Sequence, residues 1–452
     1  MAWRLPDDTQ VGPDLCSTLA EYRQAYLTFF LDYFEKGRRP RYRGGYFNIN
    51  SITGRPFEHR CCYSWTDGRS LAELSICYLL ELGPRQRLKP YMDHLCACLT
   101  ERYRLNGYLP HAVVEHSNLA ADDSLNVPIG QGQSSYSHVL VMNGLLQYAL
   151  IAQSNEARAL ANELMDDLKQ ALADDGFLEG AQPRPQGQRA QGPFMITLGV
   201  CADVLETLEA LHGASSAQFE QHAETFVALG RECVAYILQN HYRAPDNAFW
   251  EVSSGGDAVR AQEGVVITDP GHTIEFCGFA ARLARYLPED ERARLEGTCG
   301  GIFLWAASAG FHETEHLICK NVDRDTRRHI ADATVEDISQ VVQEEVLRDH
   351  FGGQGGRASF STFPWWAVME ALATGAVLRR SQDAPQVDEY ILRAVRGIFC
   401  HFVNERIGGL CYQTIGGGFF APVDLPPATP TLDLMHSHRS LRIALRELPQ
   451  QG

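Results

Sequence analysis

Two short segments carry histidines whose spacing could support proton transfer. They are Asp-Pro-Gly-His272-Thr-Ile-Glu275 and His436-Ser-His438-Arg439. Histidine both gives and takes a proton near neutral pH because its unperturbed pKa is about 6.5. Glu275 follows His272 by three residues, so on a helix its carboxylate can orient the imidazole or hold a substrate hydroxyl. His436 and His438 could instead bind a metal, but alternate residues on a helix point to different faces, and no further ligand cluster completes such a site.

Two further segments combine aromatic and charged residues. They are Tyr-Ser-Trp65-Thr-Asp-Gly-Arg69 and Trp-Trp366-Ala-Val-Met-Glu370. Taken singly, each has a plain structural interpretation, because tryptophans usually lie in the core and an arginine can simply pair with a neighbouring carboxylate. All four segments begin helices, and this shared position is what indicates a common site.

The elements that position these segments are helical hairpins. Apolar residues recur with a 3.6-residue period near 14–36, 66–82, 85–104, 135–152, 155–173, 195–212, 216–240, 271–286, 288–309, 363–379, 385–404 and 435–447. Short connections join them in pairs, and longer Gly-, Pro- and Tyr-rich loops, expected to form short strands and turns, separate the pairs. Six hairpins in a ring predict an all-α fold, the (α/α)6 barrel, in which the second helix of each step is internal. The four segments then meet at one mouth, where helix N-termini favour developing negative charge.

Composition restricts the function further. The chain has 452 residues and a net charge of −16, which disfavours nucleic acid as a partner. No apolar stretch reaches the length of a membrane span, and we expect no membrane association. The thirteen cysteines form no zinc-type C-x2-C framework and mostly lie in apolar runs, so we expect buried thiols and a cytoplasmic location. We expect one domain over residues 1–452.

One connection is unusually long. Residues 310–361 form an insert of about 50 residues, with helical spacing over 332–350 followed by the Gly-rich stretch GGQGGR. That stretch lacks the Lys-Ser/Thr of a phosphate-binding loop. The insert is expected to be either a lid over the mouth or an arm between the subunits of a homodimer, and the residues leave both open.

The motifs resemble those of the N-acylglucosamine 2-epimerase family, which includes cellobiose 2-epimerases, mannose isomerases and sulfoquinovose isomerases. The resemblance covers nearly the whole chain outside the insert. It is carried by GGYFNINSITGRP, YSWTDGR, TDPGHTIE, PWWAVMEA and MHSHR, of which TDPGHTIE, close to the family's Pro-Gly-His-x-x-Glu, is the most specific.

The resemblance implies an (α/α)6 barrel with two catalytic histidines, His272 and His436, and with Arg69 and Glu275 close to the reacting carbons. The expected sugar contacts are Trp65, Trp366, Glu370 and Asp203. Such an enzyme moves a proton at C2 of an open-chain reducing sugar through an enediolate, which Arg69 can stabilise. We expect no metal and no other cofactor.

The sequence departs from the disaccharide epimerases at three positions. Gly199 and Asp203 replace an Asn and a His on the sixth helix, and Thr431 replaces a Trp. These changes favour a monosaccharide, and we expect aldose–ketose isomerisation of a mannose-type hexose, or 2-epimerisation. Asp203 in the wall of the site would disfavour a sulfonated or carboxylated sugar unless a basic residue compensates.

Two other functions remain as alternatives. A glycoside hydrolase or lyase on the same toroid would need a pair of carboxylates, which Glu275, Glu370, Asp67 and Asp203 could supply. A helical toroid could also be a partner-binding protein without activity, but the presence of Arg69, His272 and His436 together argues against this.

Overall fold

The computed structural model describes residues 5, 9–37, 61–114, 128–179, 184–261, 264–334, 359–381, 384–404, 413–415, 421–423 and 434–448. The α-helices within these ranges are α1 (Pro13–Gly37), α2 (Ser64–Leu79), α3 (Arg85–Asn106), α4 (Tyr136–Ala152), α5 (Asn155–Asp174), α6 (Gly192–His212), α7 (Ala217–Asn240), α8 (Pro270–Ala284), α9 (Glu289–Gly310), α11 (Trp365–Leu378), α12 (Ala384–Gly397) and α13 (Ser440–Glu447). A π-helical turn, Ile398–Phe402, follows α12, and a second, Met435–Arg439, leads into α13.

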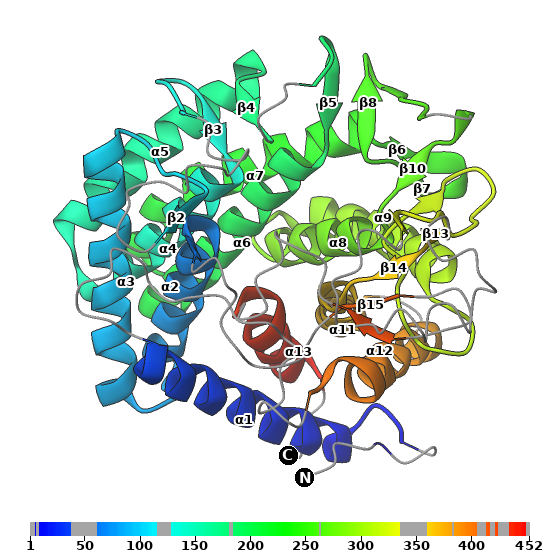
Figure 1. The fold of residues 1–452 in the computed structure, drawn as a ribbon, viewed down its shortest axis with the longest axis horizontal. Coiled ribbons are helices and arrows are strands. Elements are labelled where there is room, and N and C mark those ends of the chain that lie inside the picture. The colour runs from blue at the N-terminus through cyan, green and yellow to red at the C-terminus, as the bar shows by residue number, and fades with distance from the viewer. Residues whose placement is uncertain are drawn as a thin grey trace.

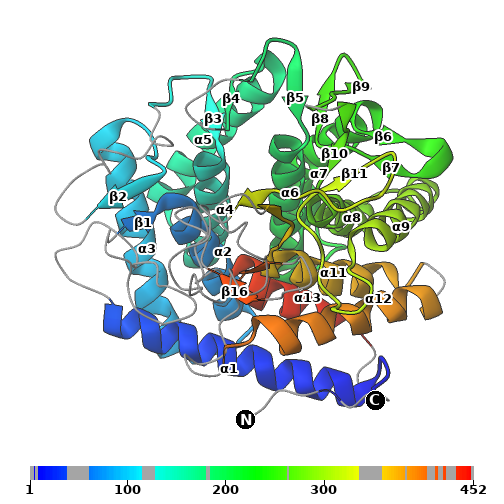
Figure 2. The same cartoon turned by 45° about the vertical axis from the view of Figure 1, so that its right-hand side comes forward.

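The helices form an inner and an outer ring (Figures 1 and 2). In the inner ring α2, α4, α6, α8, α11 and α13 each contact the next, and the π turn before α13 contacts α2 and closes the circle. Five outer helices pack on the inner helix that precedes them in sequence: α3 on α2, α5 on α4, α7 on α6, α9 on α8 and α12 on α11. The sixth outer helix, α1, packs on α13 at the other end of the chain. This is an (α/α)6 barrel, so the predicted fold is confirmed.

Burial distinguishes the two rings. Helix α4 is buried around its whole circumference, because every residue from 137 to 147 is buried. Helix α5 instead buries a stripe at helical spacing that includes Leu160, Leu164 and Leu168, as expected of an outer helix. Glycine permits close contact between inner helices: a Cβ on Gly68 of α2 would lie 2.6 Å from the Leu140 carbonyl oxygen of α4.

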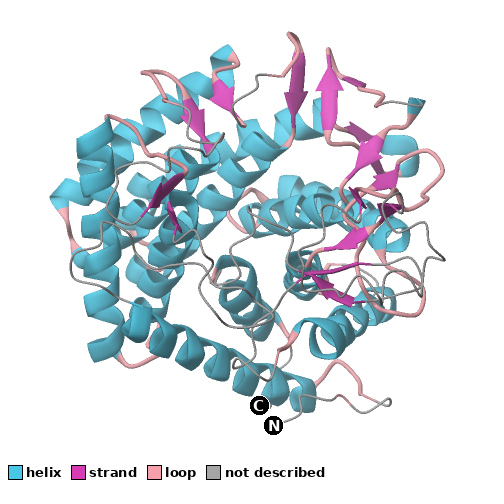
Figure 3. Cartoon of the chain, in the orientation of Figure 1, coloured by secondary structure: helices cyan, strands magenta, loops and turns pink. Residues whose placement is uncertain are grey.

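Short strands precede the inner helices. They are β1 (Cys61–Tyr63), β2 (Ala112–Val114), β3 (Ser134–Ser135), β4 (Phe177–Leu178), β5 (Gln188–Ala190), β6 (Tyr242–Arg243), β7 (Ala248–Phe249), β8 (Val252–Ser254), β9 (Asp257–Ala258), β10 (Ile267–Thr268), β11 (Val322–Asp323), β12 (Ala333–Thr334), β13 (Ser359–Phe360), β14 (Thr362–Phe363), β15 (Gln413–Ile415) and β16 (Ala421–Val423). Strands β1, β3, β5, β10 and β14 end one or two residues before α2, α4, α6, α8 and α11. Figure 3 shows most strands on the side of the molecule away from α1. The N-termini of the inner helices therefore share one end of the barrel, where the site was predicted.

The described parts of the insert are built into this strand-bearing end. Strand β11 pairs with β10 just before α8, and β12 pairs with β13. The backbone N–H of Lys320 donates to the Thr362 carbonyl at 2.8 Å. The helix predicted at 332–350 lies largely outside the described residues, so lid and intersubunit arm both stay predictions.

Two expectations from composition can be compared with the described residues. No helix among them is both long enough and apolar enough to cross a bilayer. Eleven of the cysteines among them are free thiols, and ten of these are buried, in agreement with the apolar runs that surround these residues in the sequence.

Candidate active site

Helix α8 begins at a strong N-terminal signal that also places His272. Asp269 is the N-cap residue, its carboxylate accepts the His272 backbone N–H at 3.2 Å, and Pro270 occupies the first turn. The His272 side chain is about one-third exposed (32%). Its Nδ1 lies 3.1 Å from Glu251 Oε2 and 3.4 Å from Asp269 Oδ2. The imidazole is therefore held through Nδ1, with Nε2 left for other contacts.

Glu251 is fixed independently of His272. Its Oε1 accepts from the Gln191 side-chain amide and from the Asp269 backbone N–H, both at 3.2 Å. Burial lowers the pKa of His272, but Asp269 and Glu251 together outweigh both burial and the opposing charge of Lys320, so that the pKa is raised above 6.5. His272 is thus stabilised in its protonated form.

Lys320 joins this group from the insert. Its Nζ forms an ion pair with Asp269 Oδ2 and lies 5.0 Å from the centre of the Trp366 ring. Burial lowers the pKa of Lys320, but Asp269 more than compensates, so the pKa is raised and the ammonium is retained.

Trp366, at the start of α11, connects the two predicted catalytic histidines. Its ring stacks on His272 with centroids 5.1 Å apart and lies 5.6 Å from the His436 ring. Gly271 permits this approach, because a Cβ there would lie 2.6 Å from the indole. His272 and His436, 164 positions apart in sequence, therefore contact one indole.

His436 lies in the π turn before α13 and is nearly buried, at 7% side-chain exposure. Its Nδ1 lies 2.9 Å from Glu370 Oε1, which also accepts from Arg439 Nη2 at 2.7 Å and from the Ser440 hydroxyl at 3.0 Å. Burial raises the pKa of Glu370, but Arg439 and His436 lower it by more, to about 2. Glu370 is therefore an ionised carboxylate that holds the His436 ring. It serves this role more than it offers a surface to a sugar.

Glu275 lies beside this network in a less favourable environment. Its Oε1 is 3.9 Å from His436 Nδ1 and 3.7 Å from Arg439 Nη2, and it is buried without a hydrogen-bond partner. Burial raises the pKa of Glu275, and the neighbouring Glu370 raises it further. A buried oxygen of this kind is suited to accept a donor that arrives with a substrate.

Arg69 and Trp65 contact each other at the start of α2, with the Arg69 guanidinium carbon 4.9 Å from the centre of a Trp65 ring. Trp65 also contacts the ring of His111, at 5.4 Å between centroids. The first-loop motif at 44–56 and Thr431 lie outside the described residues.

Asp203 is placed differently from expectation. Its two carboxylate oxygens accept from Arg282 at 2.5 Å and from the Asn143 amide at 3.2 Å, and its side chain is 4% exposed. Arg282 also binds Glu206. Asp203 therefore belongs to a buried ion-pair network, and Arg282 compensates its charge. Asp203 therefore does not disfavour an anionic sugar.

Gly199, the other departure on α6, is explained by packing. A Cβ there would come within 2.6 Å of the Phe279 ring on α8. The same ring lies 5.0 Å from the Arg439 guanidinium. An Asn at this position would displace the aromatic ring that supports Arg439.

His438 is directed away from His436. Its Nδ1 lies 2.7 Å from Glu73 Oε1, and Arg442 binds both oxygens of Glu73 at 3.0 Å. Within the described residues, two groups have donor atoms close enough for one metal ion: Glu73, Cys77 and His438, and Glu275, Glu370 and His436. In each, an arginine already neutralises a carboxylate, which opposes a further cation.

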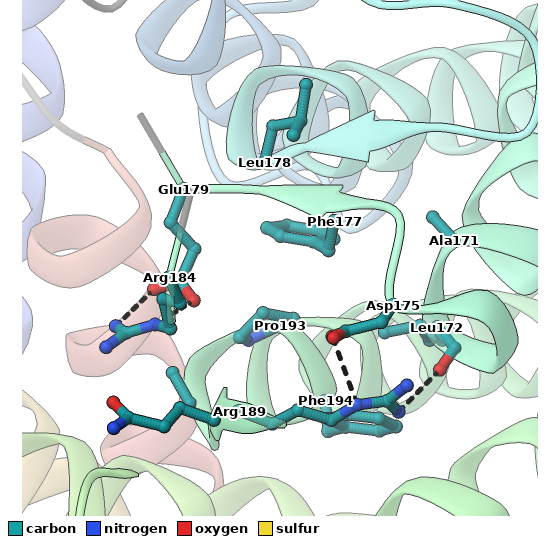
Figure 4. A pocket seen from close by; sticks show the side chains of 12 residues that line it. Ala171, Leu172, Asp175, Phe177, Leu178, Glu179, Arg184, Arg189, Pro193 and Phe194 are labelled. Carbon is teal, nitrogen blue, oxygen red and sulfur yellow. Dashed lines mark hydrogen bonds and ion pairs between the residues drawn. The ribbon is translucent and has the colours of Figure 1, made fainter. Parts of the chain in front are cut away.

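Two hollows lie apart from the histidines. The first, of about 100 Å³, lies between the end of α5, β4, β5 and the start of α6 (Figure 4). Its charged residues pair with each other, Arg184 with Glu179 and Arg189 with Asp175. The second, of about 490 Å³, is lined by residues near the C-terminal ends of α2 and α6 and by α13. Neither contains a histidine.

Sequence reasoning missed Glu251, Lys320 and the roles of Asp269 and Arg439. Asp269 had a usable signal, because an Asp directly before Pro-Gly at a helix start is a typical N-cap. Arg439 was visible within the His-x-x-Arg motif. Glu251 and Lys320 lie near two- and three-residue strands and carry no local signal.

Comparisons with solved structures agree with this architecture. A sugar epimerase from a ruminal bacterium superposes with a TM-score of 0.66 at 15% identity, over 95% of this chain and 98% of the other. Cellobiose 2-epimerase from Bacillus thermoamylovorans gives 0.66 at 13% identity, over 96% and 100%, and a D-mannose isomerase gives 0.65 at 13%, over 98% and 100%. The unsaturated glucuronyl hydrolase of Bacillus sp. GL1 gives 0.53 at 14%, over 94% and 96%. No protein-family model matches the sequence, and neither does any curated protein. The chain thus has the fold of the sugar epimerases and isomerases and, with a lower score, that of the glucuronyl hydrolase.

Proposed function

We propose that this protein is a cofactor-independent sugar isomerase or epimerase that moves a proton at C2 of an open-chain reducing sugar. The observation that carries the proposal is the pairing of two histidines on one indole, each bound through Nδ1 to a carboxylate. A carboxylate on Nδ1 fixes the tautomer and leaves Nε2 to exchange a proton with a substrate.

In the proposed reaction His436 is the base. With its Nδ1–H donated to ionised Glu370, its Nε2 lone pair accepts the proton from C2. The C–H electron pair becomes the C1–C2 double bond of the enediolate, and the carbonyl π pair moves onto oxygen. Arg69 stabilises that charge.

His272 is the proton donor. Asp269 and Glu251 favour its protonated form, so it can supply a proton to the intermediate. Delivery to C2 from the opposite face, with the carbonyl re-forming at C1, gives the 2-epimer. Delivery to C1, with the O2 proton passing to O1 and the carbonyl forming at C2, gives the ketose. Glu275, with its unsatisfied buried oxygen, would accept a sugar hydroxyl.

The hydrolase alternative finds less support in the same geometry. Of its candidate carboxylates, Asp67 is paired with buried Arg102 and Asp203 with Arg282. Glu370 accepts from three donors and is held ionised, so it cannot act as the acid. Glu275 has the raised pKa that a general acid needs, but its carboxylate neighbour among the described residues, Glu370, is already bound by three donors and is poorly placed to act as the second carboxylate.

For the substrate we propose a mannose-type hexose and aldose–ketose isomerisation, with 2-epimerisation as the variant. The D-mannose isomerase among the structural neighbours supports this choice. Because Asp203 lies in a buried ion-pair network and not in the wall of the sugar site, its charge gives no reason to exclude sulfoquinovose. This sugar is therefore included in the test.

The test is a panel of free mannose, glucose, N-acetylglucosamine, cellobiose and sulfoquinovose, together with an unsaturated glucuronide. We expect interconversion of a free sugar, with mannose to fructose the most efficient by kcat/KM. A preference for cellobiose or sulfoquinovose would change the proposed substrate but leave the proposed reaction unchanged. Release of a monosaccharide from the glucuronide without sugar interconversion would overturn the proposal.

A further inference from the structure

Lys320 is held rigidly although it belongs to the long insert. Its backbone N–H donates to Thr362 at 2.8 Å, and its neighbour Cys319 donates to the Gly310 carbonyl at 2.9 Å. Two residues later β11 pairs with β10, the strand that leads into α8. The backbone at Lys320 is therefore held by the same strands that lead into the His272 helix.

Its side chain meets two groups that contact His272. Nζ pairs with Asp269, whose carboxylate caps α8 and lies 3.4 Å from His272 Nδ1. Nζ also lies 5.0 Å from the centre of Trp366, on which His272 stacks. Asp269 is thus shared between the Lys320 ammonium and the His272 imidazole, and the Lys320 side chain remains 32% exposed.

We propose that Lys320 is a positioning residue of the catalytic site: by holding Asp269 and contacting Trp366, it fixes the His272 ring and sets how readily that ring releases its proton. Its relevance to catalysis rests on the proposed function, but its effect on His272 does not. The insert then contributes to the site through one side chain, which acts on His272 by way of Asp269 and Trp366.

The direction of the effect follows from the charges around His272. Glu251 and Asp269 face its Nδ1, Lys320 faces Asp269, Glu275 lies one turn along α8, and His436 lies across Trp366. The two carboxylates at 3.1 and 3.4 Å favour the proton on His272. Lys320 opposes them, because it neutralises Asp269 and adds a like charge near the ring. Removing its charge should make His272 hold its proton more tightly.

The test compares Lys320→Met, which removes the charge at similar length, with Lys320→Arg, which keeps it. Lys89→Met is the matched control, because Lys89 forms an exposed ion pair with Asp93 on α3, outside the site. The readout is the titration of the His272 ring by NMR of histidine-labelled protein, with its signal assigned by its loss in His272→Gln. Thermal unfolding checks that each variant folds, and Lys320→Gln replaces Lys320→Met if the latter does not.

We expect the pKa of His272 to rise by roughly one unit in Lys320→Met, the size of a neighbouring-charge effect. It should return to near the parent value in Lys320→Arg and stay unchanged in Lys89→Met. A His272 titration unchanged in folded Lys320→Met would overturn the proposal, whatever the activity. A shifted titration in a protein that interconverts no sugar would uphold the coupling and overturn the proposed function instead.

Discussion

The two histidines of the site sit in contrasting surroundings. His436 is 7% exposed and bound to Glu370, whose charge is matched by Arg439. His272 is 32% exposed and faces two carboxylates, Glu251 and Asp269, of which one is shared with Lys320. The first setting is a closed ion-pair network that orients the His436 ring. The second is a more open group with an excess of negative charge, which favours an imidazolium. A base and an acid for one proton can thus be made from the same residue type by environment alone.

Of the substitutions considered, replacement of either histidine should lower kcat the most. His272→Asn and His436→Asn are each expected to lower kcat by about 10²–10⁴-fold, the usual contribution of a general acid or base. Their stabilities should differ, because His436 donates to Glu370, whose side chain is 3% exposed, whereas His272 donates to the more exposed Glu251, at 17%. The loss in His436→Asn should therefore be the larger, at about 1–3 kcal/mol. Steady-state kinetics and urea unfolding of both variants measure this. Full activity in either folded variant would remove that histidine from the mechanism.

The carboxylates that hold the two histidines should also differ in their effects on stability. Glu370→Gln breaks a buried pair with Arg439 and should cost about 3–5 kcal/mol of unfolding free energy along with activity. Glu251→Gln should unfold more like the parent but lower kcat on the order of 10²-fold, through misplacement of His272. Glu179→Gln, which alters a paired carboxylate away from the histidines, is the control. Equal effects of all three on kcat would mean that the carboxylates have no specific role.

The pH dependence of stability should distinguish the surroundings of His272 from those of His436. Because the pKa of His272 is raised in the folded protein, its stabilising contribution is complete below about 6.5 and is lost as the pH rises through the raised value. Glu370 has a lowered pKa, so its contribution is present above about 4.5 and is lost as the pH falls toward about 2. Unfolding free energies between pH 5 and 9 should therefore show a decline on the alkaline side that His272→Asn removes. The same decline in that variant would assign it to another group.

Asp203→Asn should have the smallest effect on activity. Asp203 contacts Arg282 and Asn143 in the interior, so its loss should lower stability by about 1–3 kcal/mol and leave KM for the preferred sugar unchanged. A clear change in KM in the folded variant would return Asp203 to the sugar site. Calorimetric unfolding and initial rates give both quantities.

The sequence predicts the ring of helices well because each helix carries its own evidence in its apolar period. It also predicts that His272, His436, Trp366 and Glu370 converge, because all four lie near the starts of inner helices. It cannot place Lys320, whose approach to Asp269 depends on a two-residue pairing between β10 and β11 across some 55 positions.

The position of Asp203 on a helix was also not enough to predict which groups its carboxylate contacts. The expectation of a sugar contact came from its place on the sixth helix, but Arg282, 79 residues further along the chain, binds its carboxylate from α8. A charged residue on an inner helix can face either the mouth or a neighbouring helix, and the periodicity of an entirely buried helix does not distinguish the two.

The central claim is that two histidines move a proton at C2. The most direct test is to incubate the parent protein with the sugar that it converts in deuterium oxide over many reversible turnovers, and to locate the label by NMR. The account predicts solvent deuterium at C2 after epimerisation, or at C1 and C2 after aldose–ketose exchange, and none of either in His436→Asn. A converted sugar that carries no solvent deuterium would contradict it.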